Sequence, residues 1–259
     1  MKKFYIILTL ILFVTTSKLQ AQNDTIFYWK SGVMVHKRSI KPADLDSITF
    51  RRPTVNLPNG TITICSQVWT TTNLNVSTYR DGTPIPQVTD PTAWVNLTTG
   101  AWCYYNNSTS NGTTYGKLYN WYAVAGIHNV ASATNPALRK NLAPTGWHVP
   151  TDAEWTILTN CLGGENVAGG KMKATGTTLW LSPNTSATNS SGFTGLPGGG
   201  RIIDGITFFA AIGNSGFWWS ASEYDTTNAW NRNLYFNNGN ANRHNNYKNN
   251  GFSVRCLRD

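Results

Sequence analysis

The stretch 146–155 constrains the fold of this chain more than any other part of the sequence. It reads Gly-Trp-His-Val-Pro-Thr-Asp-Ala-Glu-Trp. Thr151 and Glu154 have the spacing of a capping box, in which each side chain bonds a backbone N–H that the first helical turn leaves unpaired. The apolar positions that follow at helical spacing are Trp155, Leu158 and Leu162. The sequence therefore predicts a capped amphipathic helix entered through a Gly-Trp turn.

Other segments predict further helices early in the chain and strands late in it. We expect one helix over 118–125 and a shorter one over 167–174. Strands are expected at 217–220, at 230–236, where apolar and polar residues alternate, and at 252–257. Asn237-Asn238-Gly239-Asn240 is a hairpin turn signal. Helices followed by an antiparallel sheet predict an α+β domain.

The first 21 residues have the features of a secretory signal peptide. Lys2 and Lys3 precede an apolar run over 4–14, and polar residues lead to an exit at Ala21. The run is shorter than the roughly 20 residues that span a bilayer, which argues against a signal anchor. We expect a secreted or cell-surface protein with no transmembrane segment in the mature chain, and the periplasm stays open as its location.

The predicted domains after the signal peptide are a short β element with a linker over 22–52 and the main domain over 53–259. Strand-like runs lie at 25–29, 33–35 and 48–50, and Pro53 ends the pattern. The element is too small to bury a core of its own. We expect it to dock on the main domain or on another protein.

Charge gives little indication of a nucleic-acid partner. The formal net charge is +9, yet only 13% of residues are charged, and the Lys and Arg residues are scattered. Nucleic-acid binders usually gather their charge into a stripe or a recognisable motif. We therefore expect no nucleic-acid partner and interpret the cations as a solvated basic surface.

The four cysteines are compatible with disulfides in an exported chain. They are Cys65, Cys103, Cys161 and Cys256, and no two of them form a CxxC pair. Spacing of this kind does not indicate a zinc site. Two disulfides are possible, with three connectivities that the sequence does not separate.

A series of ordered motifs connects the chain to a family. They are Gln67-Val68-Trp69, Asn73-Leu74, Asp81-Gly82-Thr83-Pro84-Ile85-Pro86, Tyr104-Tyr105-Asn106-Asn107, Tyr115-Gly116-Lys117-Leu118-Tyr119-Asn120-Trp121-Tyr122-Ala123, Pro144-Thr145-Gly146-Trp147-His148-Val149-Pro150, Leu196-Pro197-Gly198-Gly199, Trp218-Trp219-Ser220 and Gly251-Phe252-Ser253-Val254-Arg255-Cys256. In this order they resemble the Fibrobacter succinogenes major paralogous domain over residues 55–259. The resemblance implies an exported protein of Bacteroidetes-type bacteria.

The helix start at 149–155 is also similar to the formylglycine-generating enzyme group. That more distant similarity implies a C-type-lectin-like fold, with a short antiparallel sheet, flanking helices and long irregular loops. The chain departs from the family at Ala143, where a cysteine often stands. This departure implies that Cys103 lacks its usual partner and leaves Cys65 and Cys161 as substitutes.

The residues do not point to an enzyme. Glu154 is accounted for as a helix cap and Asp152 as a favourable charge in the first helical turn. His148 and His244 have no evident nucleophile beside them. The cysteines do not match the redox pair that formylglycine generation uses with copper. We therefore expect structural cysteines and no catalytic residues.

Calcium is a weaker alternative. Glu223, Asp225 and loop amides could supply some of the oxygen ligands that calcium needs. However, Trp230-Asn231 is followed by Arg232, and a cation at that position disfavours a calcium site. We expect no cofactor.

The late region holds aromatic, amide and basic residues that together could bind a polysaccharide. Aromatic faces stack on sugars, while amide and guanidinium groups hydrogen-bond to hydroxyls. The predicted ligand-binding residues are Trp219, Glu223, Tyr224, Trp230, Arg232, Tyr235, Arg243, His244 and Tyr247. The competing interpretation is that the tryptophans belong to the core, because each buries a large area.

We expect a non-enzymatic binding module for a polysaccharide or a cell-surface protein. The alternative is a structural or assembly component of the cell envelope that binds no glycan.

Overall fold

The computed structural model describes residues 24–30, 33–40 and 60–259. The chain divides into residues 1–53 and 54–259. In the first unit, β1 (Asp24–Lys30) and β2 (Val33–Ile40) form an antiparallel hairpin that is longer than the predicted strands. The predicted signal peptide and the strand at 48–50 lie outside the described residues. Within the described part, no helix is long and apolar enough to cross a bilayer.

The predicted capped helix is present as α5 (Asp152–Cys161). The Thr151 hydroxyl accepts from the Glu154 N–H, and the Glu154 carboxylate accepts from the Thr151 N–H at 2.7 Å. Gly146 opens the preceding turn with φ of 81°, in the left-handed region that glycine enters without strain. The shorter helix predicted over 167–174 is present as α6 (Glu165–Met172), which begins and ends two residues earlier.

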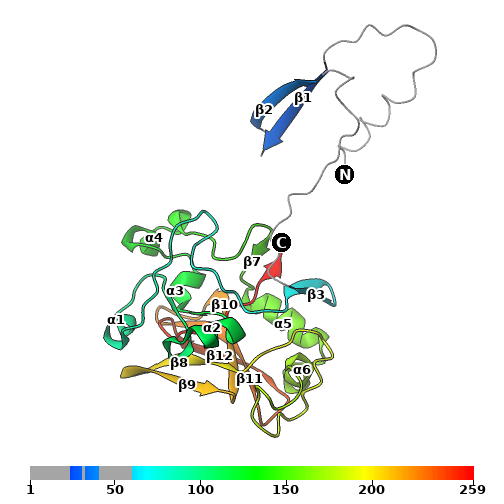
Figure 1. The fold of residues 1–259 in the computed structure, drawn as a ribbon, viewed down its shortest axis with the longest axis vertical. Coiled ribbons are helices and arrows are strands. Elements are labelled where there is room, and N and C mark those ends of the chain that lie inside the picture. The colour runs from blue at the N-terminus through cyan, green and yellow to red at the C-terminus, as the bar shows by residue number, and fades with distance from the viewer. Residues whose placement is uncertain (1–23, 31–32, 41–59) are drawn as a thin grey trace, which may run out of the picture. The chain divides into compact units, whose positions relative to one another are not determined.

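A five-stranded sheet forms the lower part of the second unit, with strand order β12-β11-β10-β8-β9 (Figure 1). Its neighbouring strands are antiparallel except for β8 and β10, which meet in a parallel pairing at Gly199 and Gly216. The strands are β8 (Gly198–Asp204), β9 (Ile206–Ile212), β10 (Ser215–Glu223), β11 (Asn228–Tyr235) and β12 (Ala241–Tyr247). The predicted hairpin turn at 237–240 joins β11 to β12.

A smaller sheet brings the two ends of the second unit together. Its order is β3-β4-β13-β7, formed by β3 (Thr61–Ile64), β4 (Gln67–Thr70), β7 (Trp147–His148) and β13 (Leu257–Arg258). The Thr70 N–H donates to the Cys256 carbonyl at 3.0 Å. The predicted closing strand over 252–257 was too long, because the chain there makes only isolated bridges before β13.

The first predicted helix is wrong at its start. Residues 118–119 form β6 (Leu118–Tyr119), paired with β5 (Trp102–Cys103), and the helix is only α3 (Trp121–Val124). The apolar spacing at 118–125 arises because this segment is buried on several sides, not on one helical face. The remaining helices are α1 (Pro91–Val95), α2 (Thr109–Tyr115) and α4 (Val130–Thr134), with short 3-10 helices η3 (Tyr105–Asn107) and η4 (Pro136–Leu138).

Aromatic residues fill the core on both faces of the large sheet. One cluster joins Trp218 and Leu234 to Trp155 of α5. On the opposite face, Trp219 packs with Phe252, with ring centroids 4.5 Å apart. The fully buried tryptophans are Trp69, Trp94, Trp147, Trp155, Trp180, Trp218 and Trp219.

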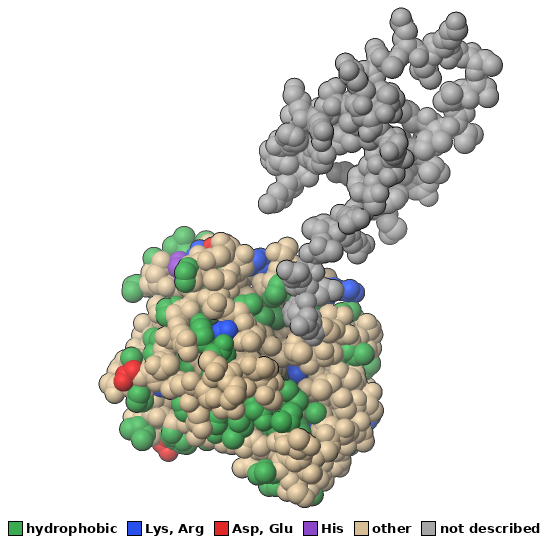
Figure 2. All heavy atoms as spheres, viewed as in Figure 1, with side chains coloured by type: hydrophobic (Ala, Val, Ile, Leu, Met, Phe, Trp, Pro, Cys, Tyr) green, Lys and Arg blue, Asp and Glu red, His purple; other side chains and the backbone are tan. Residues whose placement is uncertain are grey.

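Several cations lie inside the protein instead of forming the solvated basic surface predicted from the sequence. Arg255 is fully buried and donates to Asn73 and to the carbonyls of Thr70, Phe193 and Thr194. The Lys173 amine likewise donates to three backbone carbonyls at 2.8–2.9 Å. Irregular loops leave carbonyls without helix or sheet partners, and these cations supply the missing donors. On the face shown in Figure 2, charged side chains are correspondingly few and scattered.

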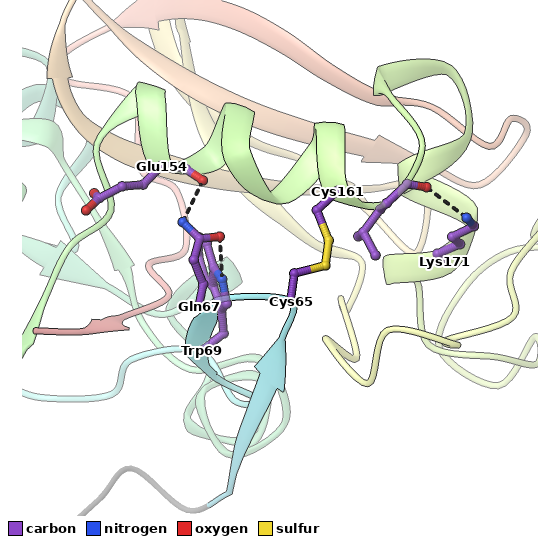
Figure 3. Close-up of a disulfide and its surroundings, with 7 residues drawn as sticks. Cys65, Gln67, Trp69, Glu154, Cys161 and Lys171 are labelled. Carbon is purple, nitrogen blue, oxygen red and sulfur yellow. Dashed lines mark hydrogen bonds between the residues drawn. A yellow bond between two sulfur atoms is a disulfide. The ribbon is translucent and has the colours of Figure 1, made fainter.

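A disulfide ties the small sheet to the end of α5 (Figure 3). It joins Cys65, in the turn between β3 and β4, to Cys161. Nearby, the Gln67 amide donates to the Glu154 carbonyl at 3.0 Å, which fixes the hairpin against the helix at a second point. Cys103 and Cys256 are free and buried, and burial raises the pKa of each thiol to about 12. One of the two possible disulfides is therefore present.

Candidate binding surface

The hairpin of β11 and β12 places the predicted late residues on two opposite faces. Residues paired across antiparallel strands share a face. Trp230 pairs with Asn245, Arg232 with Arg243, and Asn228 with Tyr247, so these side chains lie on the face that α5 also covers. Asn231 pairs with His244, which places both on the other face.

Arg243 is held in one position by two different contacts. Its guanidinium makes a bidentate pair with Asp152, with Nε and Nη2 at 2.9 and 2.8 Å from Oδ2. Its Cζ atom lies 3.4 Å from the centre of the Trp230 ring. Tyr224 contacts the same ring edge-on, with centroids 4.8 Å apart. The result is a layered group in which an arginine covers one face of a tryptophan.

Around this group lie aromatic and amide side chains that are open to solvent. Tyr224 is 50% exposed and Tyr247 is 54% exposed. Asn245 is exposed beside Trp230 on β12. We refer to Tyr224, Trp230, Arg243, Asn245 and Tyr247 as the aromatic platform.

The Asp152 carboxylate is the negative charge that holds the platform in place. Partial burial opposes its ionisation, but hydrogen bonds from Arg243 and Arg232 outweigh that effect and lower the pKa of Asp152. The same hydrogen bond raises the pKa of Arg243. Both groups are therefore charged across the physiological range, and the pair stays intact.

Comparison of the sequence with known protein families shows where the chain belongs. Residues 62–258 match the Fibrobacter succinogenes major domain. The chain belongs to this family. No curated protein and no solved structure matches it.

Within the family domain, two of the nine predicted binding residues are interior residues. Trp219 is fully buried, and its indole N–H donates to the Tyr119 carbonyl at 2.9 Å. Arg232 is also fully buried and donates to Asp152 at 2.6 Å. Neither can touch a ligand on the surface of the family domain, because the segments around Tyr119 and Phe252 cover Trp219 and α5 covers Arg232.

The other predicted residues separate into three groups. Tyr224, Trp230, Arg243 and Tyr247 form most of the platform. Glu223 lies at the end of β10 and pairs with the Lys248 amine. Tyr235 and His244 lie on the opposite face of the hairpin, as the strand register requires.

The carboxylates considered for calcium already have partners in the family domain. Asp225 accepts from the N–H groups of Thr227 and Asn228 at 2.7 Å, and hydrogen bonds from Asn228 and Thr227 lower its pKa to about 2. Asn231 is fully buried, and neither of its side-chain amide atoms has a hydrogen-bond partner within the described residues. The alternation predicted for 230–236 fails here because β11 is buried on both faces.

The cavities of the domain do not coincide with the platform. One of about 380 Å³ lies between Asn73–Val76 and the end of α2. Another of about 390 Å³ is lined by Trp121, Arg139 and His148. None of the nine predicted residues lines either of them. Tyr224, Arg243 and Tyr247 are exposed, so the platform is an open surface.

Sequence reasoning missed Asp152 and Asn245 as parts of this surface. Asp152 lies 91 positions before Arg243, and its place in the first turn of α5 gave a sufficient local explanation. Asn245 could have been found by aligning β12 with β11 through the hairpin turn. Only the register shows that it stands beside Trp230.

Proposed function

We propose that the family domain of this chain is a non-enzymatic, C-type-lectin-like binding module for glycans. The platform formed by Tyr224, Trp230, Arg243, Asn245 and Tyr247 is the observation that carries the proposal. The pairing of β4, near the start of the domain, with the last strand β13 supports the lectin-like part of it, as do the flanking helices and long loops. The Cys65–Cys161 disulfide supports an exported protein, since such bonds persist in oxidising compartments.

The chemistry of the platform fits a polysaccharide. Tyr224 and Tyr247 are about half-exposed, and the C–H faces of a sugar ring stack on aromatic rings of this kind. The Asn245 amide can both donate to and accept from hydroxyls. Small-molecule sites are usually concave, whereas an open surface suits a polymer contacted along its length.

Preorganisation favours binding at this surface. Arg243 is fixed between Asp152 and Trp230, so little conformational entropy is lost when a ligand contacts it. An exposed arginine with no such partners would have to be immobilised first. We expect modest affinity for one sugar unit and stronger binding to longer chains.

The proposal is tested by screening the purified protein against bacterial and plant polysaccharides, with and without calcium. For a ligand that binds, Tyr247→Ala and Tyr224→Ala should each weaken affinity by about tenfold, which corresponds to roughly 1.4 kcal/mol. Leu181→Ala, at an exposed apolar position elsewhere, is the matched control.

Each variant must keep the unfolding midpoint of the parent protein. Binding that is unchanged in both tyrosine variants would exclude the platform as the site. A screen with no ligand at all would overturn the glycan proposal and favour a cell-envelope assembly role.

A further inference from the structure

Strand β9 forms the edge of the large sheet opposite to β12. Its sequence is Ile-Thr-Phe-Phe-Ala-Ala-Ile, with neither a charged residue nor a proline. An edge strand carries backbone N–H and C=O groups that point away from its sheet neighbour and are free to pair with another strand. Within the described residues, β8 is the one strand that pairs with β9.

One face of β9 is covered and the other is not. Thr207 is buried and accepts from Arg201, and Phe209 packs against Tyr105 with centroids 5.4 Å apart. On the opposite face, Ile206 is 71% exposed and Phe208 is 43% exposed. The strand therefore combines a free backbone edge with an apolar surface.

β9 lacks a charged side chain and a proline, two of the devices that usually protect a sheet edge. The helix α1 packs on its covered face, where the Arg201 guanidinium lies over both Trp94 and Phe209. Edge strands are commonly protected by charged side chains, proline or a covering element. The opposite edge, β12, carries Arg243 and His244. Asp204, at the end of β8, is the nearest charge before β9 along the chain.

We propose that β9 pairs in antiparallel orientation with β9 of a second copy of this chain, which gives a two-fold symmetric dimer. Ala211 has φ of 67°, which ends the regular backbone and limits the pairing segment to 206–210. The axis then passes beside Phe208, and Ile206 faces Ala210 of the second copy.

Self-pairing is favoured by the absence of charge in the segment 206–210. Asp204 lies in β8, outside this segment, so antiparallel pairing about Phe208 places no charge opposite another. Like charges directly opposite each other destabilise a strand pair. A second β9 brings no charge onto the apolar face, and closed two-fold pairing leaves no free edge for further growth.

The test measures the mass of the purified protein by sedimentation velocity over a range of concentrations. The parent protein should double in mass as concentration rises, and Phe208→Lys should stay a monomer at every concentration. Tyr247→Lys, an exposed aromatic position on the opposite edge strand, is the matched control and should dimerise normally. Equal unfolding midpoints establish that both variants are folded.

A parent protein that is monomeric throughout, a dimer that persists in Phe208→Lys, or open-ended aggregation overturns the proposal. The register has its own test, since Phe208→Cys should form a disulfide-linked dimer under mild oxidation. Tyr247→Cys should not, and cross-linking of both to the same extent would contradict pairing through β9. Because the readout is mass, failure here leaves the glycan proposal untouched.

Discussion

The two outer strands of the large sheet, β12 and β9, have opposite chemistry. β12 carries Arg243, His244 and a tyrosine, and its arginine is tied to α5 through Asp152. β9 is uncharged and presents Ile206 and Phe208 to solvent. The two strands have the same length, seven residues, and the same position at a sheet margin.

This difference shows that the side chains of an edge strand determine what kind of partner the edge can bind. At β12, polar side chains point outward and are already oriented, so the edge can recognise a polar ligand while resisting strand addition. At β9, the backbone edge and apolar side chains favour another strand. Under the two proposals, one sheet would separate ligand binding from self-association by its full width.

Asp152→Asn removes the carboxylate that holds the β12 edge against α5, and we expect it to have the largest effect on stability. The change leaves the buried Arg232 guanidinium without its counter-charge. Removing one partner of a buried pair costs about 3–5 kcal/mol, and urea unfolding followed by tryptophan fluorescence measures it. Asp204→Asn, beside the β9 edge, is the control and should leave the unfolding curve unchanged. Equal losses in both variants would contradict the contrast between the edges.

The second largest effect should be a loss of stability at the β12 edge in acid. Hydrogen bonds lower the pKa of Asp152 in the folded protein, while an unfolded Asp titrates at about 3.9. Between the folded and unfolded pKa values of Asp152, the unfolded state binds more protons than the folded state. The stabilisation that the ionised Asp152 provides is therefore complete above about pH 4–5 and is lost as pH falls through the folded pKa. Asp152→Asn should flatten that part of the pH profile. An identical profile in the variant would show that other carboxylates cause the acid loss.

A smaller effect is expected for Arg243→Lys. Lysine keeps the charge but not the planar fork that bonds Asp152 in two places and stacks on Trp230. Exposed cation–π contacts contribute about 0.5–1 kcal/mol, so the unfolding free energy should fall by about 1 kcal/mol. Arg258→Lys, at another exposed position, should have no measurable effect. A loss as large as that of Asp152→Asn would mean that Arg243 supports the core.

The smallest expected effect is an opposite response of the two edges to sodium sulfate. Excluded salts strengthen apolar burial, so the dimer fraction through β9 should rise. The same salt screens the partly exposed Arg243–Asp152 pair, and glycan affinity at the platform should hold or fall slightly. Sedimentation and binding titrations on one sample measure both. A parallel rise in both would indicate that the glycan surface is also dominated by apolar contacts.

Local sequence signals predicted the elements that interactions between neighbouring residues determine. The Thr151 and Glu154 capping box gave α5, and the 237–240 turn gave the last hairpin. The first helix was placed too early because periodicity cannot separate a helical face from a segment buried on several sides, as Leu118 is. The parallel pairing of β8 and β10 has no local signal at all.

Much of the platform could be predicted because its residues lie close together in the sequence. Trp230, Arg243 and Tyr247 come from one hairpin and Tyr224 from the loop just before it, and residue chemistry alone suggested them. Trp219 and Arg232 were misassigned because aromatic and guanidinium groups serve cores as well as surfaces. Arg232 is buried under α5 beside the Asp152 carboxylate, which lies 80 positions before it, and Trp219 is buried on the opposite face of the sheet against Phe252.

The disulfide has a consequence for how the chain must be made. Cys65 and Cys161 are 96 positions apart, and Cys103 lies between them. A chain that emerges amino terminus first therefore presents two thiols, Cys65 and Cys103, well before the correct partner arrives. The native bond forms if Cys65 stays reduced until Cys161 arrives, if β5 has already folded Cys103 out of reach, or if an early wrong bond is exchanged through an attacking thiolate. The order in which the cysteines emerge, as well as the final geometry, determines which sulfur atoms are joined.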